Sequence, residues 1–242
     1  MARFVLIHGS WHNGSAWDSV IAHLESKGHT ALAPTMAGHG KNVQRKGITH
    51  AQCTKSISDF IVSNDLRDFV LVGHSFAGTV ISKIAEQMPE RIRRLVFWNA
   101  FVLKDGNSLN DEIPPPYREL FAELVKQSDD NSVMAPFQVW REAFINDADL
   151  ELAKSAYEHL APEPYQPFID KIDMKRFYSV DIPRSYLNCT EDIALPPGEW
   201  GWHPRMSSRL GLYRLVQMPG SHEAMFTNPT GLAEKIIEAG RD

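Results

Sequence analysis

The stretch from Phe69 to Gly78 constrains the fold of this chain more than any other part of it. Its first four residues are apolar and partly β-branched, which predicts a short strand buried on both faces of a sheet. A turn of small residues follows, and residues 79–86 after it have the composition of a helix. Strands buried on both faces belong to parallel sheets that helices cover on both sides. The stretch therefore predicts an α/β protein in which this strand leads through a sharp turn into a helix.

The rest of the chain repeats this alternation on either side of a long interruption. Apolar runs predict strands, and amphipathic spacing predicts helices. The predicted strands are 3–8, 29–33, 69–72, 94–100, 184–189 and 212–218, and the predicted helices are 16–27, 49–64, 79–86 and 229–239. Alternation at this spacing indicates right-handed crossovers and a mostly parallel, doubly wound sheet. Because ligand sites in such sheets lie at the carboxyl ends of the strands, residues that directly follow strands are the candidates for a site.

The interruption spans residues 104–182. It contains clusters of prolines and helical spacing at 117–127, 137–145 and 149–160, without a run that has the pattern of a strand. We interpret it as a helical cap inserted into a core formed by residues 1–103 and 183–242, within a single structural domain. The alternative is an ordinary helical layer packed on the sheet.

A cap over the strand ends would supply part of a binding pocket. The interruption is rich in aromatic residues, which favours an apolar pocket for planar substrates. We expect Trp140 and Phe144 of the cap, together with Trp11 of the core, to contact the substrate.

Composition excludes several classes of function. The 242 residues, of which 43% are hydrophobic and 23% charged, are enough for one domain with a large core. A net charge of −5 without a long run of like charge provides no basic surface for nucleic acid or an anionic membrane. Cys53 and Cys189 lack the spacing of metal ligands, and we expect neither a metal nor a disulfide.

The chain begins directly with its first apolar run. That run is too short to span a bilayer and lacks the features of a signal peptide. We therefore predict a cytoplasmic protein that acts on a small molecule and binds neither nucleic acid nor membrane. The sequence does not determine the oligomeric state, so a homodimer is possible.

Ser75 stands in the turn between the central strand and its helix. Gly73 and Ala77 flank it and Gly78 follows, so the pattern is Gly-x-Ser-x-Ala in place of the usual Gly-x-Ser-x-Gly. A serine on such a turn projects its hydroxyl from the edge of the sheet, beside the free N–H groups of a helix N-terminus. The alternative is a serine that only forms the turn.

A carboxylate and a histidine follow the last two predicted strands. These residues are Asp192 and His222. Serine is a poor nucleophile at neutral pH, so an imidazole must take its proton and a carboxylate must orient the imidazole. We predict Ser75 as the nucleophile, His222 as the general base and acid, and Asp192 as the orienting carboxylate. Glu191, adjacent to Asp192, is the alternative carboxylate.

The negative oxygen that forms during such an attack needs two N–H donors. The backbone N–H of Phe76, directly after the serine, is the first candidate. The loop from His8 to Gly14 follows the first strand and reaches the same edge of the sheet, and we predict the N–H of Ser10 as the second donor. The alternative is that the glycines of this loop only shape a tight turn.

Taken together, these motifs resemble the α/β-hydrolase superfamily. The matching segments are Phe4–Gly14 with Trp17, Gly73–Gly78, Thr190–Pro196 and Gly220–Met225, and the order serine, acid, histidine along the chain is that of the superfamily. The chain is most similar to the branch of plant methylesterases, hydroxynitrile lyases and related bacterial esterases. The resemblance implies the α/β-hydrolase fold and a cofactor-free enzyme with a Ser-Asp-His triad beneath a helical cap, which cleaves small esters, carbamates or amides.

Three classes of function remain open. The first, which we predict, is a serine hydrolase that cleaves a small apolar or aromatic ester, or an ester-like carbonyl such as a carbamate, through an acyl-enzyme on Ser75. The second is a lyase or a cofactor-free dioxygenase on the same fold. In hydroxynitrile lyases a lysine follows the catalytic histidine and a threonine follows the histidine of the first loop, whereas this chain has Glu223 and Gly9. A carboxylate would repel the cyanide that a lysine stabilises. The third is a binder of small molecules without catalysis.

Overall fold

The computed structural model describes residues 1–242, and a six-stranded parallel sheet forms its centre. The order of the strands is β2-β1-β3-β4-β7-β8. Their bounds are β1 (Arg3–Ile7), β2 (Thr30–Leu32), β3 (Phe69–His74), β4 (Ile92–Trp98), β7 (Arg184–Cys189) and β8 (Arg214–Met218). The register places Ile7 opposite Gly73 and His74 opposite Trp98, so β1, β3 and β4 end side by side. The predicted parallel sheet is confirmed.

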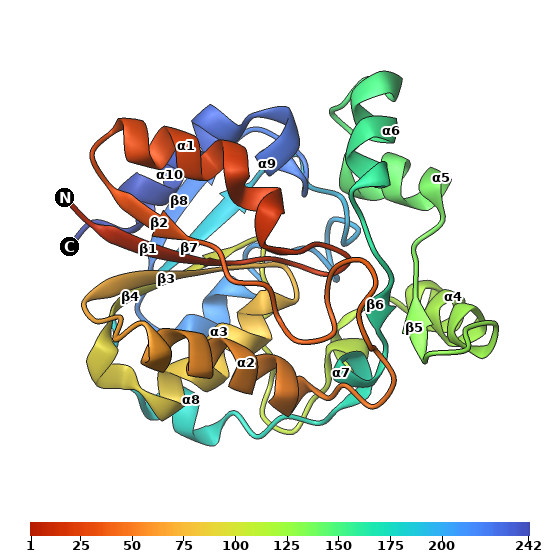
Figure 1. Cartoon of the computed structure of the whole chain (residues 1–242), viewed down its shortest axis with the longest axis horizontal. Coiled ribbons are helices and arrows are strands. Elements are labelled where there is room, and N and C mark those ends of the chain that lie inside the picture. Colours follow the sequence, from red (N-terminus) through yellow and green to blue (C-terminus); the bar gives the residue numbers. More distant parts are fainter.

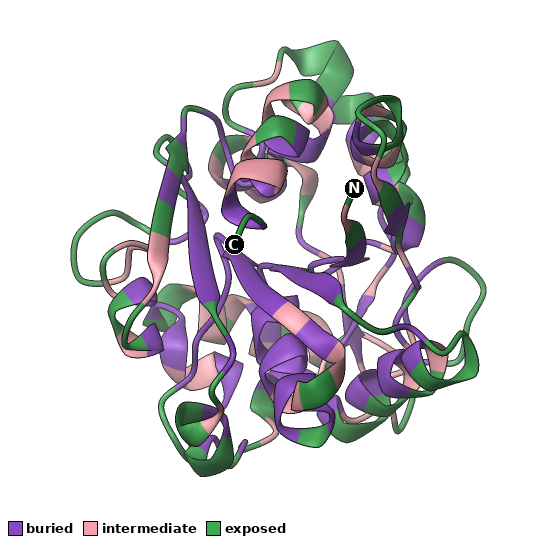
Figure 2. Ribbon diagram, turned by 90° about the vertical axis from the view of Figure 1, so that its left-hand side faces the viewer, coloured by how far each residue is buried: buried purple, intermediate pink, exposed green.

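Helices cover both faces of this sheet. On one face lie α1 (Asp18–Ser26), α9 (Ala224–Thr227) and α10 (Pro229–Ala239), and on the other lie α2 (His50–Ser63), α3 (Ala77–Gln87) and α8 (Lys175–Ser179) (Figure 1). Since successive side chains of a strand point to opposite faces, Phe69 and Leu71 of β3 enter one apolar cluster while Val70 and Val72 enter the other. Figure 2 shows the central strands largely buried between helices that expose their outer sides. The sheet is doubly wound, as predicted.

Residues 104–182, called the insertion below, contribute no strand to the central sheet. They contain α4 (Pro115–Lys126), α5 (Phe137–Val139), a π-helix (Trp140–Phe144), α6 (Leu150–Glu158), α7 (Gln166–Ile169) and α8. Helices α4 to α7 lie beyond the carboxyl ends of the strands, and α8 returns to one face of the sheet (Figure 1). That the insertion forms a cap over the candidate site stays a proposal.

The insertion also holds a small sheet that the sequence pattern did not indicate. Strands β5 (Ser132–Val133) and β6 (Glu163–Pro164) pair in antiparallel orientation. Two residues are too few to produce an alternating pattern, which is why only helices and loops were predicted there.

Short 3₁₀ helices complete the secondary structure. They are Gly14–Trp17, Pro89–Arg91, Leu109–Glu112 and Ser207–Leu210. None of the helices is both long enough and apolar enough to cross a membrane.

Candidate active site

Ser75 occupies the tight turn between β3 and α3. Its φ angle is 54°, in the left-handed region that residues other than glycine rarely adopt. A Cβ atom on Gly78 would lie 2.3 Å from the carbonyl oxygen of Phe101, and one on Gly73 would lie 3.0 Å from the carbonyl oxygen of Ala77. The methyl group of Ala77 is fully buried in the core. Close packing around the turn therefore leaves no room for a side chain at position 78 and little at position 73, and it accepts alanine at position 77.

The structure brings Asp192 and His222 together in a buried hydrogen bond. Nδ1 of His222 donates to Oδ2 of Asp192 at 2.6 Å. The carboxylate also accepts from the N–H of Ala194 at 2.8 Å and from the side-chain amide of Asn99. Because a carboxylate only accepts, the proton of the neutral imidazole is on Nδ1, and Nε2 is free to accept another.

Glu191, the alternative carboxylate, has a different partner. Its Oε2 accepts from the N–H of Gly220 at 3.1 Å, and its own N–H donates to the carbonyl oxygen of Gly220 at 3.2 Å. These bonds join the loops that carry Asp192 and His222. The geometry therefore favours Asp192 as the orienting carboxylate and Glu191 as a brace between the two loops.

Aromatic rings enclose the imidazole of His222. Trp202 stacks on it with 5.1 Å between ring centroids and an interplanar angle of 12°, and Phe144 meets it edge-on at 5.6 Å. Burial lowers the pKa of His222, but the carboxylate of Asp192 and, to a smaller extent, that of Glu223 outweigh it. The pKa consequently lies above the ordinary value of 6.5. His222 thus keeps its proton up to a higher pH than an ordinary histidine does.

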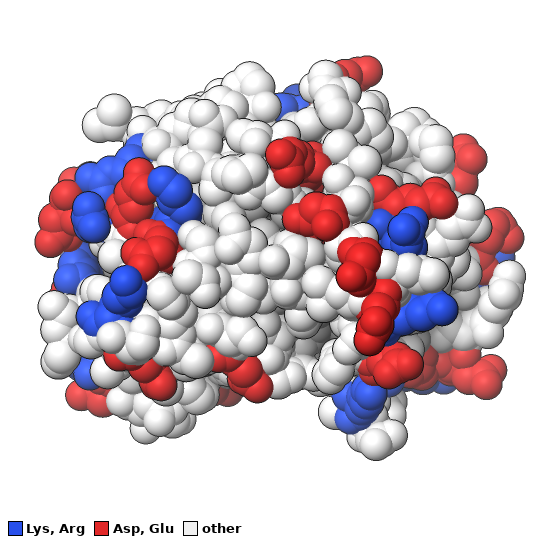
Figure 3. Space-filling model, turned by 90° about the horizontal axis from the view of Figure 1, so that it is seen from above, with Lys and Arg blue, Asp and Glu red and all other residues white.

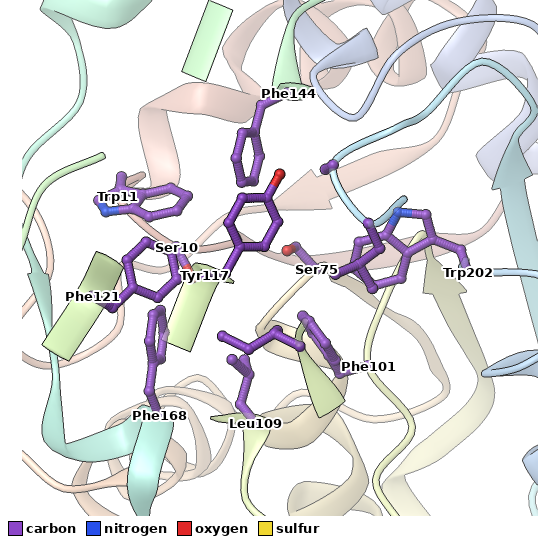
Figure 4. A pocket seen from close by; sticks show the side chains of 13 residues that line it. Ser10, Trp11, Ser75, Phe101, Leu109, Tyr117, Phe121, Phe144, Phe168 and Trp202 are labelled. Atoms are coloured by element: carbon purple, nitrogen blue, oxygen red, sulfur yellow. The ribbon is translucent and has the colours of Figure 1, made fainter. Parts of the chain in front are cut away.

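Ser75 opens onto a cavity lined by aromatic and aliphatic side chains (Figure 4). The empty space is about 380 Å³, including the part that is open to solvent. The lining residues are Ser10, Trp11, Ser75, Phe101, Leu109, Ile113, Tyr117, Phe121, Phe144, Phe168, Ala194, Leu195 and Trp202. None of them is charged. His222 is not itself a lining residue, but two lining side chains, Trp202 and Phe144, contact its imidazole.

The structure places two of the three predicted substrate contacts at this cavity. Trp11 and Phe144 line it, but Trp140 does not. The indole of Trp140 is buried against Tyr157 of α6, with 5.6 Å between ring centroids. Trp140 therefore packs inside the insertion, and the structure does not support the expectation that it contacts the substrate.

Sequence reasoning missed most of the aromatic lining. Tyr117 and Phe121 of α4 and Phe168 of α7 face the cavity (Figure 4). Their helical spacing is the same whether a residue faces a cavity or the interior of the insertion, so periodicity could not single them out.

The two predicted oxyanion donors lie beside Ser75. Ser10 and Ser75 line the same cavity, and a Cβ atom on Gly9 would lie 3.0 Å from Cβ of Ser75. The backbone N–H groups of Ser10 and Phe76 form no hydrogen bond within the protein. The next N–H in the loop, that of Trp11, donates to Oε2 of Glu163 at 2.9 Å. The geometry therefore leaves Ser10 and Phe76 as candidate donors, and their role stays a prediction.

The remaining histidine, cysteine and carboxylate side chains form no metal site. No group of three or more His, Cys, Asp or Glu residues is arranged to hold a metal ion. Cys53 and Cys189 are buried and unpaired, and burial raises the pKa of both thiols.

Comparisons with known proteins agree with this architecture. A family model described as the alpha/beta hydrolase family matches residues 4–235. The carbendazim hydrolyzing esterase of Nocardioides sp. (strain SG-4G) is 38% identical over 130 residues, which are 52% of this chain and 53% of that protein. The match thus spans about half the length of that relative. Methylesterase 1 of Arabidopsis thaliana is 26% identical over 98% of this chain and 95% of its own length.

A solved structure matches over the whole length of both chains. It is described as an extracellular alpha/beta-hydrolase from a Paenibacillus species with homology to tobacco salicylic acid binding protein 2, and it has 43% sequence identity and a TM-score of 0.97. Because that relative is described as extracellular, the cytoplasmic location of this chain stays a prediction. The resemblance to methylesterases and bacterial esterases is confirmed, and so is the predicted fold. The chain belongs to the alpha/beta hydrolase family.

Proposed function

We propose that the chain is a cofactor-free serine hydrolase, which cleaves small uncharged esters or ester-like carbonyls such as carbamates through an acyl-enzyme on Ser75. One observation carries the proposal: Ser75 opens onto an uncharged cavity, and Trp202 and Phe144 of its lining contact the imidazole of His222, which is hydrogen-bonded to Asp192. The matches with esterases support an ester hydrolase.

Acylation begins with the attack of Ser75 Oγ on the substrate carbonyl. Nε2 of His222 takes the hydroxyl proton as the new C–O bond forms, and Asp192 stabilises the resulting imidazolium. The negative charge passes to the carbonyl oxygen, where the N–H groups of Ser10 and Phe76 would receive it. The tetrahedral intermediate collapses when the bond to the alcohol breaks, and the imidazolium returns the proton to the leaving oxygen.

Deacylation repeats these steps with water. His222 takes a proton from a water molecule, whose oxygen attacks the acyl carbonyl. The same two N–H groups stabilise the second tetrahedral intermediate, which breaks the bond to Ser75 Oγ. The serine regains its proton from His222, and the acid is released.

Two features speak against a hydroxynitrile lyase. The carboxylate of Glu223 bonds to His12 at 2.9 Å, with both side chains buried, so it offers no cation for cyanide. A Cβ atom on Gly9 would lie 2.9 Å from Nδ1 of His74 and 3.0 Å from Cβ of Ser75. A threonine at this position would therefore displace the nucleophile turn.

The uncharged lining predicts discrimination against charged acyl groups. A carboxylate in this cavity would lose its hydration without gaining a cation. We expect 4-nitrophenyl butyrate to be hydrolysed with a kcat/KM at least about tenfold above that of 4-nitrophenyl hydrogen succinate, because burial of an unpaired charge is costly. The two esters share a leaving group and an acyl length, so their initial rates with the purified protein isolate the effect of the charge.

This pair of esters also tests the proposed function. If the protein hydrolyses neither ester, the proposal of a serine hydrolase is contradicted. Equal kcat/KM values for the two esters would contradict the preference for uncharged substrates. The face shown in Figure 3 carries lysine and arginine side chains interspersed with acidic ones, without the continuous basic surface that a polyanion would need.

The raised pKa of His222 predicts the pH dependence. Only neutral His222 accepts the serine proton, so kcat/KM should rise with pH through the pKa of this residue, above the ordinary value of 6.5. Glu223→Gln removes a negative charge that raises this pKa, and we expect the acidic limb of the profile to move to lower pH. The measurement is kcat/KM against pH.

Glu234→Gln is the matched control for this pH profile, because it also removes a carboxylate that contacts a histidine. Glu234 bonds to His23 at 2.9 Å on the surface, away from the cavity. The profile of Glu234→Gln should coincide with that of the wild type. A Glu223→Gln profile that coincides with it as well would show that Glu223 does not act on His222.

A further inference from the structure

The loop that carries Ser10 is bonded to the insertion through Trp11. The N–H of Trp11 donates to Glu163 at 2.9 Å, its indole Nε1 donates to the carbonyl oxygen of Val133 at 3.1 Å, and its carbonyl oxygen accepts from the N–H of Ala161 at 2.9 Å. Val133 and Glu163 are paired residues of β5 and β6. The φ angle of Trp11 is 65°, in the left-handed region. The small sheet of the insertion thus holds an unusual backbone conformation next to Ser10.

Glu163 is completely buried, and a buried carboxylate needs a partner for its charge. His39, in the loop after β2, provides it: Nε2 donates to Glu163 at 3.0 Å, and Nδ1 donates to the carbonyl oxygen of Ala37 at 3.0 Å. Both ring nitrogens face acceptors, as they do in an imidazolium. Burial lowers the pKa of His39, but the charge of Glu163 and these hydrogen bonds outweigh it and raise the pKa. A buried ion pair therefore joins the insertion to the core.

This ion pair lies beside both candidate oxyanion donors. Glu163 accepts a hydrogen bond from the N–H of Trp11. This N–H and the N–H of Ser10 belong to consecutive peptide groups, which are joined at the Cα atom of Ser10. The ring of His39 lies nearly parallel to the ring of Phe76, with 6.2 Å between centroids and an interplanar angle of 17°. A displacement of the Trp11 peptide would move the Cα atom of Ser10 and with it the Ser10 N–H, and loss of His39 would loosen the packing of Phe76.

We propose that Glu163 is a positioning residue of the oxyanion hole: paired with His39, it holds the Trp11 peptide so that the N–H of Ser10 faces the cavity at Ser75. The inference rests on the proposed function, because it takes Ser10 as an oxyanion donor. The insertion would then position the loop that carries Ser10, in addition to lining the cavity. Catalysis then requires that β6 be in place against the loop after β1.

Two variants test the role of the ion pair, and a third is the matched control. Glu163→Gln removes the charge and keeps an oxygen that can accept from Trp11. His39→Gln removes the cation and keeps an N–H donor toward Glu163, and it leaves the hydrogen bond between Glu163 and Trp11 in place. Glu86→Gln is the control, because the buried Glu86 also accepts a backbone N–H, from Phe177 at 3.1 Å, and pairs with the cation of Lys83, away from the cavity.

The expected result is a loss of kcat without a matching change of KM. We expect Glu163→Gln to lower kcat for 4-nitrophenyl butyrate by about 10- to 100-fold, somewhat less than the complete loss of an oxyanion donor, with KM within about threefold of the wild type. The rate at which a fluorophosphonate modifies Ser75 should fall by a similar factor, since that reaction also places a negative oxygen in the hole. His39→Gln should act in the same direction by a smaller factor.

The control separates positioning from general loosening. Glu86→Gln should lower the melting temperature comparably and leave kcat within about twofold of the wild type, since it removes a similar buried contact elsewhere. If Glu86→Gln and Glu163→Gln lose kcat equally, the inference is wrong. A higher KM with unchanged kcat in Glu163→Gln would also overturn it, because Glu163 would then only support the indole of Trp11 in the cavity wall.

The wild-type protein distinguishes this failure from a failure of the proposed function. If the wild type neither hydrolyses the ester nor reacts with the fluorophosphonate, the hydrolase itself is wrong. If the wild type does both and His39→Gln and Glu163→Gln behave like the control, only the positioning role fails. Should Glu163→Gln not fold, the kcat of His39→Gln relative to Glu86→Gln decides.

Discussion

Replacement of Ser75 by alanine is expected to lower kcat for 4-nitrophenyl butyrate by at least about 1,000-fold, because the members of a catalytic triad act as one unit. The variant should keep the fold, since the smaller side chain removes only a hydroxyl that faces the cavity. Initial rates and a thermal melt of both proteins measure the two effects. A fluorophosphonate should modify the wild type once, on Ser75, as peptide mass spectrometry would show.

A second serine serves as the control for this prediction. Ser185 is buried in β7, where its hydroxyl donates to the carbonyl oxygen of Ala239 at 2.7 Å, and it does not line the cavity. Ser185→Ala should retain the activity and the modification of the wild type, whereas Ser75→Ala should lose both. Substantial turnover by Ser75→Ala would exclude an acyl-enzyme on this residue.

The second large effect is expected at Asp192. Asp192→Asn should lower kcat by about 1,000- to 10,000-fold, because an amide can donate to Nδ1 of His222 and so favours the tautomer that cannot accept the serine proton. Glu191→Gln is the matched control, since its amide oxygen can still accept from the N–H of Gly220. Its kcat should stay within a few-fold of the wild type.

The opposite ranking would falsify the assignment of the carboxylate. An inactive Glu191→Gln beside an active Asp192→Asn would mean that the loop after β7 adopts another arrangement during catalysis. Circular dichroism of both variants would verify that neither result comes from unfolding.

Local sequence patterns were enough to predict the sheet and the edge at which the candidate site lies. Buried strands leave continuous apolar runs and surface helices leave a helical period, and both patterns are local. The predicted bounds of β7 and α10 therefore equal the observed ones. The residues that follow the strands were also determined in this way, because parallel strands all end at one edge. Ser75, Asp192 and His222 were proposed as site residues by that rule.

The choice between adjacent residues and the contacts between distant ones depended on how the chain packs in three dimensions. Asp192 and Glu191 are adjacent and chemically alike, and only the path of their loop turns one to His222 and the other to Gly220. Trp140 and Phe144 lie in the same short helix, but Trp140 packs against Tyr157 of α6 whereas Phe144 lines the cavity.

Glu163 shows the limit of sequence reasoning most clearly. It reaches its partner His39 across 124 residues, from a strand of two residues that has no recognisable pattern. Local periodicity records which side of an element is apolar. It does not record which polar groups will meet when the elements pack, because that depends on how the insertion folds against the core.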